Sequence, residues 1–391
     1  MEKPINATRI ASIDLLKGLV MVLMALDHTR DYFHGANMLF DPGDPNHSTL
    51  PIFFTRWITH FCAPAFSLLA GLSAYMISRR KTIPELSAFL IKRGIWLVII
   101  EATVVNFGWY FDIYFNSFGF HVIWALGMSM IVLGILVHLP RNFILIFSLI
   151  LIFGHNLLDS IHFKGNVFWG MLHDGVAVKI SEKGFFIVGY PIIPWVAVMS
   201  LGYWFGKFYD KSYDRVKRKK WFNIIGLSAL VLFFMLRYSN IYGDPTPWVD
   251  KPEVSKDLIS FFNPLKYPPS LLYLLMTLGV TFLFLANSEK WKGKIVDFFS
   301  TFGRVPFFYY ILHIYLIHLG AMLAAVLTGY SWHTMASHLW LYENPALKGY
   351  GFPLWVVYAV WIVVILLLYP VCRKFDQYKM NHKEKWWLSY L

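Results

Sequence analysis

Charged residues, cysteines and internal repeats are all scarce in this sequence. Only 15% of its 391 residues are Asp, Glu, Lys or Arg, and it has two cysteines, whereas soluble domains carry about 25% charged residues. So few charges argue against a soluble fold. Cys62 and Cys372 lie in different predicted helices at different depths, which argues against a disulfide framework. No duplicated motif divides the chain into halves, which weakly disfavours transporters built from inverted repeats.

Apolar residues are correspondingly abundant, at 57% of the chain, and 19% of the residues are aromatic. Segments of about 20 apolar residues, long enough to cross a bilayer at roughly 1.5 Å per residue, recur throughout. We therefore expect an all-α polytopic membrane protein forming a single domain over residues 1–391. About ten transmembrane helices are expected, near residues 10–29, 52–78, 94–113, 120–139, 142–159, 185–206, 221–240, 268–287, 304–328 and 353–372.

The distribution of Lys and Arg predicts the orientation, because cytoplasmic loops retain an excess of positive charge. If both termini are cytoplasmic, 24 of the 35 Lys and Arg residues fall on that side. They lie in the N-terminus, residues 79–93, Arg141, residues 207–220, residues 290–304 and the C-terminal tail. This asymmetry, together with contact to anionic lipids, accounts for the net charge of +12 and points to a bilayer rather than to nucleic acid as the partner.

The first predicted span is unusual because it carries charges. A charge in the bilayer costs several kcal/mol unless it is paired or faces a cavity, so such residues usually mark function. Near the inner end, Asp14 and Lys17 are spaced to form an ion pair, although Lys17 can instead bind an anion. A structural and a functional role are about equally expected for these two.

A second polar turn follows eleven residues later, about 16 Å along a helix axis. It contains Asp27, His28, Arg30 and Asp31. His28 and Asp31 are spaced i, i+3, so a carboxylate can reach the imidazole, fix its tautomer and raise its basicity, which is the arrangement of a general base. The alternative is a solvated helix end with local ion pairs, but the apolar flanks favour the functional interpretation of His28.

These residues resemble the opening signature of integral-membrane acyltransferases. The signature comprises Arg9, Asp14, the run Leu16-Lys17-Gly18, and a histidine ten positions after the glycine, here His28. In the acyltransferase-three type, which O-acylates sugars, the histidine at this place is the proposed catalytic residue. The resemblance therefore implies a catalytic role for His28.

Further motifs extend the resemblance to nearly the whole chain, and are similar to a bacterial branch near the heparan-α-glucosaminide N-acetyltransferase family. They are Phe61-Cys62-Ala63-Pro64-Ala65-Phe66 with Ala70-Gly71, Pro191-Ile192-Ile193-Pro194-Trp195, Lys266-Tyr267-Pro268-Pro269-Ser270, and residues 303–310 with His313 and His318. The heparan enzyme has asparagine at the position of His28 and a later catalytic histidine. The resemblance thus assigns the base to His28 or His34, and less readily to His47.

The resemblance implies acetyl-CoA as the acyl donor and an extracytoplasmic sugar or glycan as the acceptor, in the inner membrane of a bacterium. CoA phosphates cannot enter lipid, but the thin pantetheine arm can thread a helix bundle if cations hold the nucleotide at the inner face. The candidate cations are Lys17, Arg79, Arg80, Lys81, Lys92 and Arg93. Taken singly, those in the loop are more simply explained as ordinary positive-inside residues.

The thioester is then expected beside His28, with Arg30, Arg56 or His60 as donors to the oxyanion. Direct transfer and an acyl-histidine intermediate both remain open. Glu101, Asn106 and His121 either line the same cavity or are satisfied by neighbouring helices. His313 and His318 are five apart on a helix, unlike the i, i+4 spacing of a helical metal pair, so no metal is expected.

The sequence thus predicts a membrane acyltransferase that uses a histidine as general base or acyl carrier. The competing class is a proton-coupled transporter or a lipid or glycan flippase in which the buried Asp, His and Arg residues bind substrate or relay protons. A third class is an assembly protein that has the fold without catalysis. The acceptor, the acyl length and the oligomeric state, a homodimer included, stay open.

Overall fold

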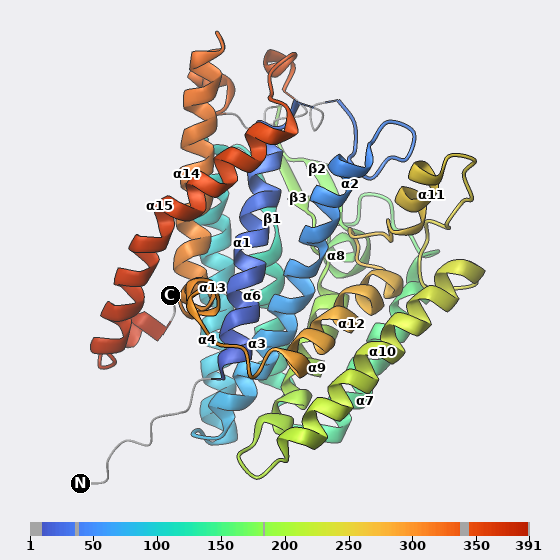
Figure 1. Ribbon diagram of the computed structural model, residues 1–391, viewed down its shortest axis with the longest axis vertical. Coiled ribbons are helices and arrows are strands. Elements are labelled where there is room, and N and C mark those ends of the chain that lie inside the picture. Colours follow the sequence, from blue (N-terminus) through green and yellow to red (C-terminus); the bar gives the residue numbers. More distant parts are fainter. Residues whose placement is uncertain (1–9, 36–38, 183, 337–343, 390–391) are drawn as a thin grey trace.

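The computed structural model describes residues 10–35, 39–182, 184–336 and 344–389, and this part of the chain is mostly helical (Figure 1). The helices are α1 (Ala11–Phe33), α2 (Leu50–Trp57), α3 (Cys62–Ser78), α4 (Ile83–Ile100), α5 (Asn106–Tyr110), α6 (Val122–Leu136), α7 (Arg141–Gly154), α8 (Val167–Trp169), α9 (Ile192–Phe205), α10 (Arg215–Ser239), α11 (Val254–Phe261), α12 (Leu271–Asn287), α13 (Lys294–Arg304), α14 (Pro306–Leu327) and α15 (Leu354–Asn381). The strands are β1 (Phe118–Phe120), β2 (Val176–Lys179) and β3 (Phe185–Val188).

Each of the ten predicted spans overlaps a helix, but fewer helices are long enough and apolar enough to cross a membrane. Within the described residues, five meet both conditions: Leu50–Ser78, Arg141–Leu158, Arg215–Ser239, Pro306–Leu327 and Leu354–Asn381. Two shorter apolar helices are α6 and α12. The chain is therefore an integral membrane protein by length and composition, whereas the count of ten and the side on which the termini lie stay predictions.

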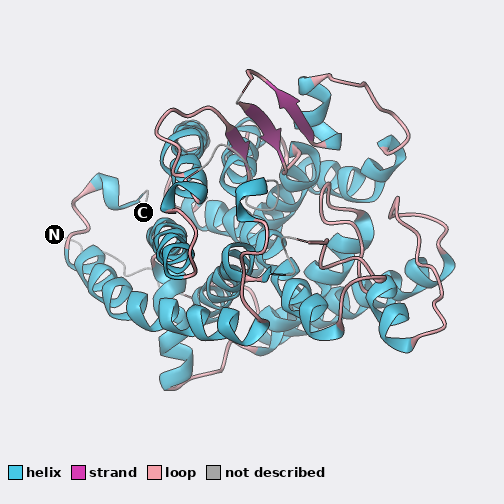
Figure 2. Ribbon diagram, turned by 90° about the horizontal axis from the view of Figure 1, so that it is seen from above, coloured by secondary structure: helices cyan, strands magenta, loops and turns pink. Residues whose placement is uncertain are grey.

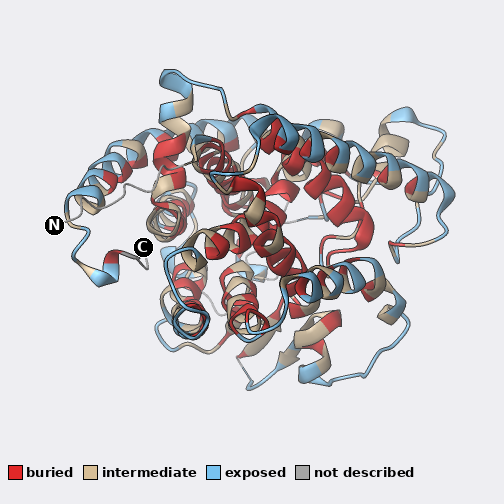
Figure 3. Cartoon of the chain, turned by 90° about the horizontal axis from the view of Figure 1, so that it is seen from below, coloured by how far each residue is buried: buried red, intermediate tan, exposed pale blue. Residues whose placement is uncertain are grey.

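Helix α1 lies within the bundle and is buried along most of its length. Figure 3 shows the buried residues of the interior in red. Helix α1 contacts α3, α13, α14 and α15. Glycines allow the closest of these contacts: a Cβ on Gly18 would lie 1.8 Å from the carbonyl oxygen of Phe299, and one on Gly303 would lie 1.8 Å from that of Asp14. These glycines let the α1 and α13 backbones touch near Lys17.

The small residues of α3 serve a similar purpose, because small side chains at four-residue spacing let two helices approach closely. A Cβ on Gly71 would lie 1.8 Å from the carbonyl oxygen of Met199 on α9. Ser67 donates a hydrogen bond to the carbonyl of Trp195, also on α9, at 3.0 Å. These small residues therefore hold α3 against α9.

The expectation of an all-α fold is wrong in one respect, because the chain also forms a three-stranded sheet in the order β1-β3-β2. Strand β1 pairs in parallel with β3, with Phe118 opposite Phe186, and β2 pairs antiparallel with β3, with Val176 opposite Val188. The sheet lies at the edge of the bundle (Figure 2). Its strands have only three or four residues, too short for an alternating pattern to be recognised.

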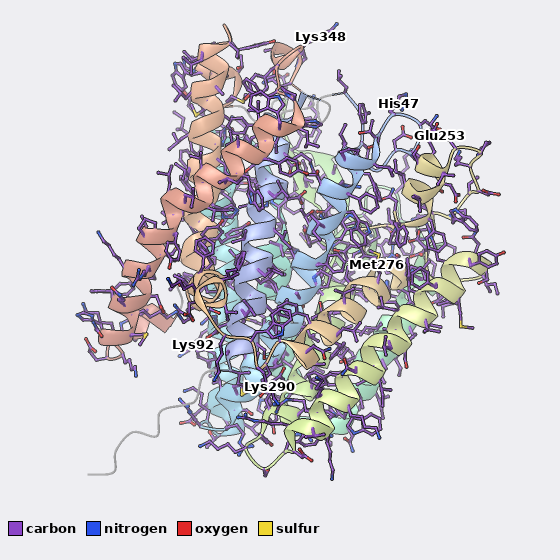
Figure 4. All side chains as sticks on the ribbon, viewed as in Figure 1. His47, Lys92, Glu253, Met276, Lys290 and Lys348 are labelled. Carbon is purple, nitrogen blue, oxygen red and sulfur yellow. The ribbon has the colours of Figure 1, made fainter. Side chains whose placement is uncertain are left out.

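The two ends of the molecule differ in the residues they carry. Lys92 and Lys290 lie toward one end, and His47, Glu253 and Lys348 toward the other (Figure 4). We name them the inner and the outer end after the orientation predicted from the sequence. Helix α1 begins at the inner end and ends at the outer one, so Lys17 and His28 lie at successive levels between them (Figure 1).

Candidate active site

Asp27, His28 and Asp31 line a cavity of about 120 Å³ in the outer half of the bundle. We call it the outer cavity. Its walls are formed by Met24, Asp27, His28, Asp31, Thr59, Cys62, Ala63, Phe66, Trp109, His121, Val122, Tyr190, Lys266, Tyr267 and Tyr310. The structure thus brings the predicted polar turn of α1 together with residues from six other segments of the chain.

The imidazole of His28 is held by a second histidine. Its Nδ1 lies 2.8 Å from Nε2 of His313 on α14, and the two ring planes are within 8° of each other. Nδ1 of His313 lies 3.0 Å from the backbone carbonyl oxygen of Tyr309. In the described part of the chain no hydrogen bond reaches Nε2, the other ring nitrogen of His28. His28 itself lines the outer cavity.

Aromatic rings fix the orientation of His28 further. The indole of Trp109 on α5 packs edge-on against it with ring centroids 4.7 Å apart, and Tyr310 lies 6.4 Å away. Tyr32 in turn donates a hydrogen bond to the carbonyl of Trp109 at 2.6 Å. An imidazole packed and hydrogen-bonded in this way has little freedom to rotate.

The carboxylates of the polar turn bind cations and not the imidazole. One terminal nitrogen of Arg30 lies 2.8 Å from Asp27 and 2.7 Å from Asp31, and Nζ of Lys266 lies 3.4 Å from the other oxygen of Asp27. The predicted contact of a carboxylate with His28 is therefore replaced by His313. The reason is that Arg30, on the same helix, already pairs with both carboxylates.

His34, the alternative base, occupies a different place. It is the residue after α1, it is buried, and its backbone pairs with Phe352 in an isolated bridge. Burial and the nearby guanidinium of Arg30 hold the pKa of His34 below its usual value. It is not among the residues that line the outer cavity. His47 is exposed, with its Nδ1 2.6 Å from a carboxylate oxygen of Asp44.

A second, larger cavity of about 220 Å³ lies toward the inner end, and we call it the inner cavity. Lys17 and Arg93 line it, and the rest of its wall is mostly apolar. Met24, Phe66, Val122 and Tyr310 belong to the walls of both cavities. The two cavities therefore adjoin each other along α1, between the level of Lys17 and that of His28.

The predicted donor-binding cations separate into two groups. Lys17 and Arg93 line the inner cavity, and Nζ of Lys17 donates to the hydroxyl of Ser73 at 2.9 Å. Arg79 forms an ion pair with Asp210, while Arg80, Lys81 and Lys92 are exposed. Nζ of Lys81 lies 5.9 Å from the ring centroid of Phe89, itself a wall residue of the inner cavity.

The predicted oxyanion donors are placed less favourably. Arg30 is paired with carboxylates, Arg56 lies 3.4 Å from Asp41, and neither Arg56 nor His60 lines the inner or the outer cavity. Tyr310 is better placed, because its side chain lies where the two cavities adjoin. No sequence pattern distinguished Tyr310 from the neighbouring tyrosines.

The buried polar groups of the neighbouring helices have different roles. His121 lines the outer cavity, and its backbone N–H and Nδ1 lie 2.9 and 3.2 Å from a carboxylate oxygen of Glu101. Asn106 bonds to the backbone of Ser117 and Gly119 and is structural. Across the described residues, no three His, Cys, Asp or Glu side chains form a group that can hold a metal ion.

Sequence reasoning did not assign His313, Lys266 and Tyr267 to the site. Lys266 and Tyr267 come from a loop before α12 and His313 from α14. The only signal for them was their place in the Lys266–Ser270 and residue 303–313 motifs. That signal marks a position as part of a family pattern but does not say what it contacts.

Comparison with protein families finds a match over residues 9–238 to the family described as heparan-alpha-glucosaminide N-acetyltransferase, catalytic. The match covers more than half of the chain, including Lys17, His28 and Arg93, and ends before Lys266 and His313. Comparison with curated protein sequences finds no significant match. On the family match, this chain belongs to the heparan-α-glucosaminide N-acetyltransferase catalytic-domain family.

Proposed function

We propose that the protein transfers an acetyl group from cytosolic acetyl-CoA to a hydroxyl or amine of an extracytoplasmic sugar or glycan, in the cytoplasmic membrane of a bacterium. The observation that carries the proposal is the pair of adjoining cavities, which leads from cations near the inner end to His28 in the outer half. A donor that is charged at one end and thin and flexible at the other fits this shape. The family supplies acetyl transfer as the reaction class.

The inner cavity is proposed to hold the donor. Lys17 and Arg93 offer cationic groups to the phosphates of CoA, while the mostly apolar wall accepts the pantetheine arm. The eleven residues from Lys17 to His28 span about 16 Å of helix, a distance that an extended pantetheine arm can cover. The thioester then lies among the shared wall residues, next to the imidazole of His28.

The outer cavity is proposed to hold the acetyl group and the reacting group of the acceptor. Its volume of about 120 Å³ compares with the roughly 150 Å³ of an engineered cavity that binds benzene. A short acyl group fits such a space and a long fatty-acyl chain does not. Tyr190 and Tyr267, whose hydroxyls lie 3.2 Å apart, belong to the same wall, and Tyr267 is 42% exposed. The acceptor therefore enters past this tyrosine pair.

His28 is proposed to act as the general base through Nε2. In direct transfer the acceptor O–H or N–H gives its proton to Nε2 while its oxygen or nitrogen bonds to the thioester carbonyl. The C–S bond then breaks, and the proton passes to the sulfur to release free CoA. Tyr310 belongs to the walls of both cavities, and its hydroxyl is proposed to donate to the developing oxyanion.

The test is CoA release from acetyl-CoA by the purified protein in nanodiscs, with a panel of amino sugars and glycans. We expect acceptor-dependent release that His28→Ala reduces by roughly 10²–10⁴-fold, the usual contribution of a general base. His47→Ala is the matched control, because His47 is exposed and lines neither cavity.

Two results would contradict the proposal. Full turnover by His28→Ala would remove His28 from the chemistry. Absence of both CoA release and acetyl-CoA binding in the wild type, combined with substrate uptake driven by a pH gradient, would establish the transporter class instead. In that case the charges of Asp27, Arg30 and Lys266 would serve substrate or proton binding.

A further inference from the structure

The hydrogen bonds behind His28 determine where its protons lie. The carbonyl oxygen of Tyr309 can only accept, so Nδ1 of His313, at 3.0 Å, must carry a hydrogen. A neutral His313 then has a lone pair at Nε2. Because Nδ1 of His28 is 2.8 Å from that lone pair, it must donate to it. A neutral His28 is thereby left with its own lone pair at Nε2.

The opposite assignment, in which His313 donates to His28, is disfavoured by burial. It requires a hydrogen on both nitrogens of His313, which makes this residue a cation. His313 is fully buried, and in the described part of the chain no carboxylate forms an ion pair with it. An unpaired charge at such a place costs several kcal/mol, so the neutral chain of hydrogen bonds is the one that the structure accommodates.

We propose that His313 is a positioning residue that holds His28 in the Nδ1–H tautomer, so that the unprotonated Nε2 faces the outer cavity. The inference rests on the proposed function, since it assigns a partner to the proposed base. In this arrangement the neutral imidazole of His313 takes the place of the carboxylate that usually forms a hydrogen bond to a catalytic histidine. His313 touches neither donor nor acceptor and acts only through His28.

During acetyl transfer only His28 changes its protonation state. When the acceptor gives its proton to Nε2, His28 becomes an imidazolium and the Nδ1–H bond to His313 becomes charge-assisted. His313 keeps the hydrogen on its own Nδ1, bonded to Tyr309. When the proton moves on to the sulfur of CoA, His28 returns to the starting tautomer. His313 therefore neither gains nor loses a proton in a turnover.

Substitutions of His313 can separate positioning from packing. His313→Leu fills a similar space but offers no acceptor to Nδ1 of His28, whereas the side-chain carbonyl of glutamine in His313→Gln can replace the lone pair. His318→Leu is the matched control. His318 is buried on the same helix, but its ring nitrogens lie 2.9 and 3.1 Å from the carbonyls of Gly108 and Met335. Within the described residues no hydrogen bond joins it directly to His28.

For His313→Leu we expect kcat to fall by about 10–100-fold, the usual effect of removing the partner that orients a site histidine. The KM for acetyl-CoA should change little, because His313 lines neither cavity. His313→Gln should recover most of the activity. His318→Leu should keep the wild-type kcat per folded molecule. Monodisperse elution and thermal unfolding measure how much of the variant is folded.

A second measurement tests the inference without relying on activity. Nitrogen-15 spectra of histidine-labelled protein in lipid, with His28 assigned by its loss in His28→Asn, report which ring nitrogen carries the hydrogen. We expect the Nδ1–H tautomer in the wild type and in His313→Gln, and a mixture of tautomers in His313→Leu.

Several outcomes would overturn the positioning role. They are an Nε2–H tautomer in the wild type, full kcat in His313→Leu, an equal loss in His313→Leu and His313→Gln, or a loss confined to donor KM. Absence of CoA release in the wild type would contradict the proposed function. The tautomer of His28 would then still decide whether His313 positions it.

Discussion

The inner and the outer cavity share α1 and four wall residues but differ in chemistry. The inner cavity is the larger, at about 220 against 120 Å³, and its wall is mostly apolar with Lys17 and Arg93 as its cations. The outer cavity contains Asp27, His28 and Lys266. Helix α1 thus borders a mostly apolar cavity at the level of Lys17 and a charged, hydrogen-bonded site at the level of His28, about three turns further on.

The difference follows from what each cavity is proposed to contain. A passage for the pantetheine arm needs little more than shape and apolar contact, with charge only where phosphates arrive. A site for proton transfer needs groups held at fixed distances, and these come from α1, α5, α14 and the loop before α12. Changes in the inner cavity should therefore affect donor binding, and changes in the outer cavity should affect chemistry.

The largest effect is expected from closing the inner cavity. Ala70→Trp places a large side chain on the α3 wall of this cavity and should block the pantetheine arm, which lowers turnover by at least about 100-fold and abolishes acetyl-CoA binding. Calorimetry with acetyl-CoA and CoA-release assays measure both. Ala88→Trp is the control, since Ala88 is exposed on α4 and lines neither cavity. Equal loss in both variants would indicate misfolding, and unchanged donor binding in Ala70→Trp would contradict the donor route.

The sequence predicts some features of the two cavities and not others. Local spacing placed Lys17 and His28 at two levels of one helix, and the structure agrees. Apolar runs predicted most helices because a helix in lipid needs about 20 apolar residues, whereas the short strands of the sheet left no recognisable pattern.

Partners across the bundle could not be predicted, because they depend on packing. His313 is 285 positions from His28, and Lys266 is 239 positions from Asp27. The spacing within the polar turn predicted a carboxylate contact with His28, and local ion pairs were only the alternative. It could not show that Arg30 would pair with both carboxylates. Likewise, only the structure separates Arg93, in a cavity wall, from the exposed Arg80.

Arg93 and Arg80 therefore provide the next test of the comparison. A charge-assisted hydrogen bond contributes about 1.5–3 kcal/mol, so Arg93→Ala should raise the KM for acetyl-CoA by about tenfold or more with little change in kcat. Arg80→Ala should alter neither, because its side chain lies outside the inner cavity. Steady-state kinetics with acetyl-CoA as the varied substrate distinguish the two. A reversed order would place the nucleotide on the loop between α3 and α4 instead.

A smaller effect is expected at the mouth of the outer cavity. Tyr267→Ala removes the exposed member of the tyrosine pair and admits water, so acetyl-CoA hydrolysis without acceptor should rise a few-fold. Tyr267→Phe keeps the ring and loses only the hydroxyl contact with Tyr190, and should change hydrolysis less. Release of CoA in the absence of any glycan is the readout. Hydrolysis that stays at the wild-type level in Tyr267→Ala would argue against entry past these tyrosines.

The smallest effect concerns His34, at the outer end of α1 but outside the outer cavity. Burial, and then Arg30, lower its pKa, so the unfolded chain, with a histidine pKa of about 6.5, binds protons more readily than the fold does. Stability should thus be lost as pH falls below about 6.5 toward the folded pKa, and be unaffected above it. His34→Gln should reduce this loss while turnover at neutral pH stays near the wild-type value. Thermal unfolding at pH 7.5 and 5.0, paired with CoA release, measures both, and a loss of turnover as large as in His28→Ala would assign the base to His34.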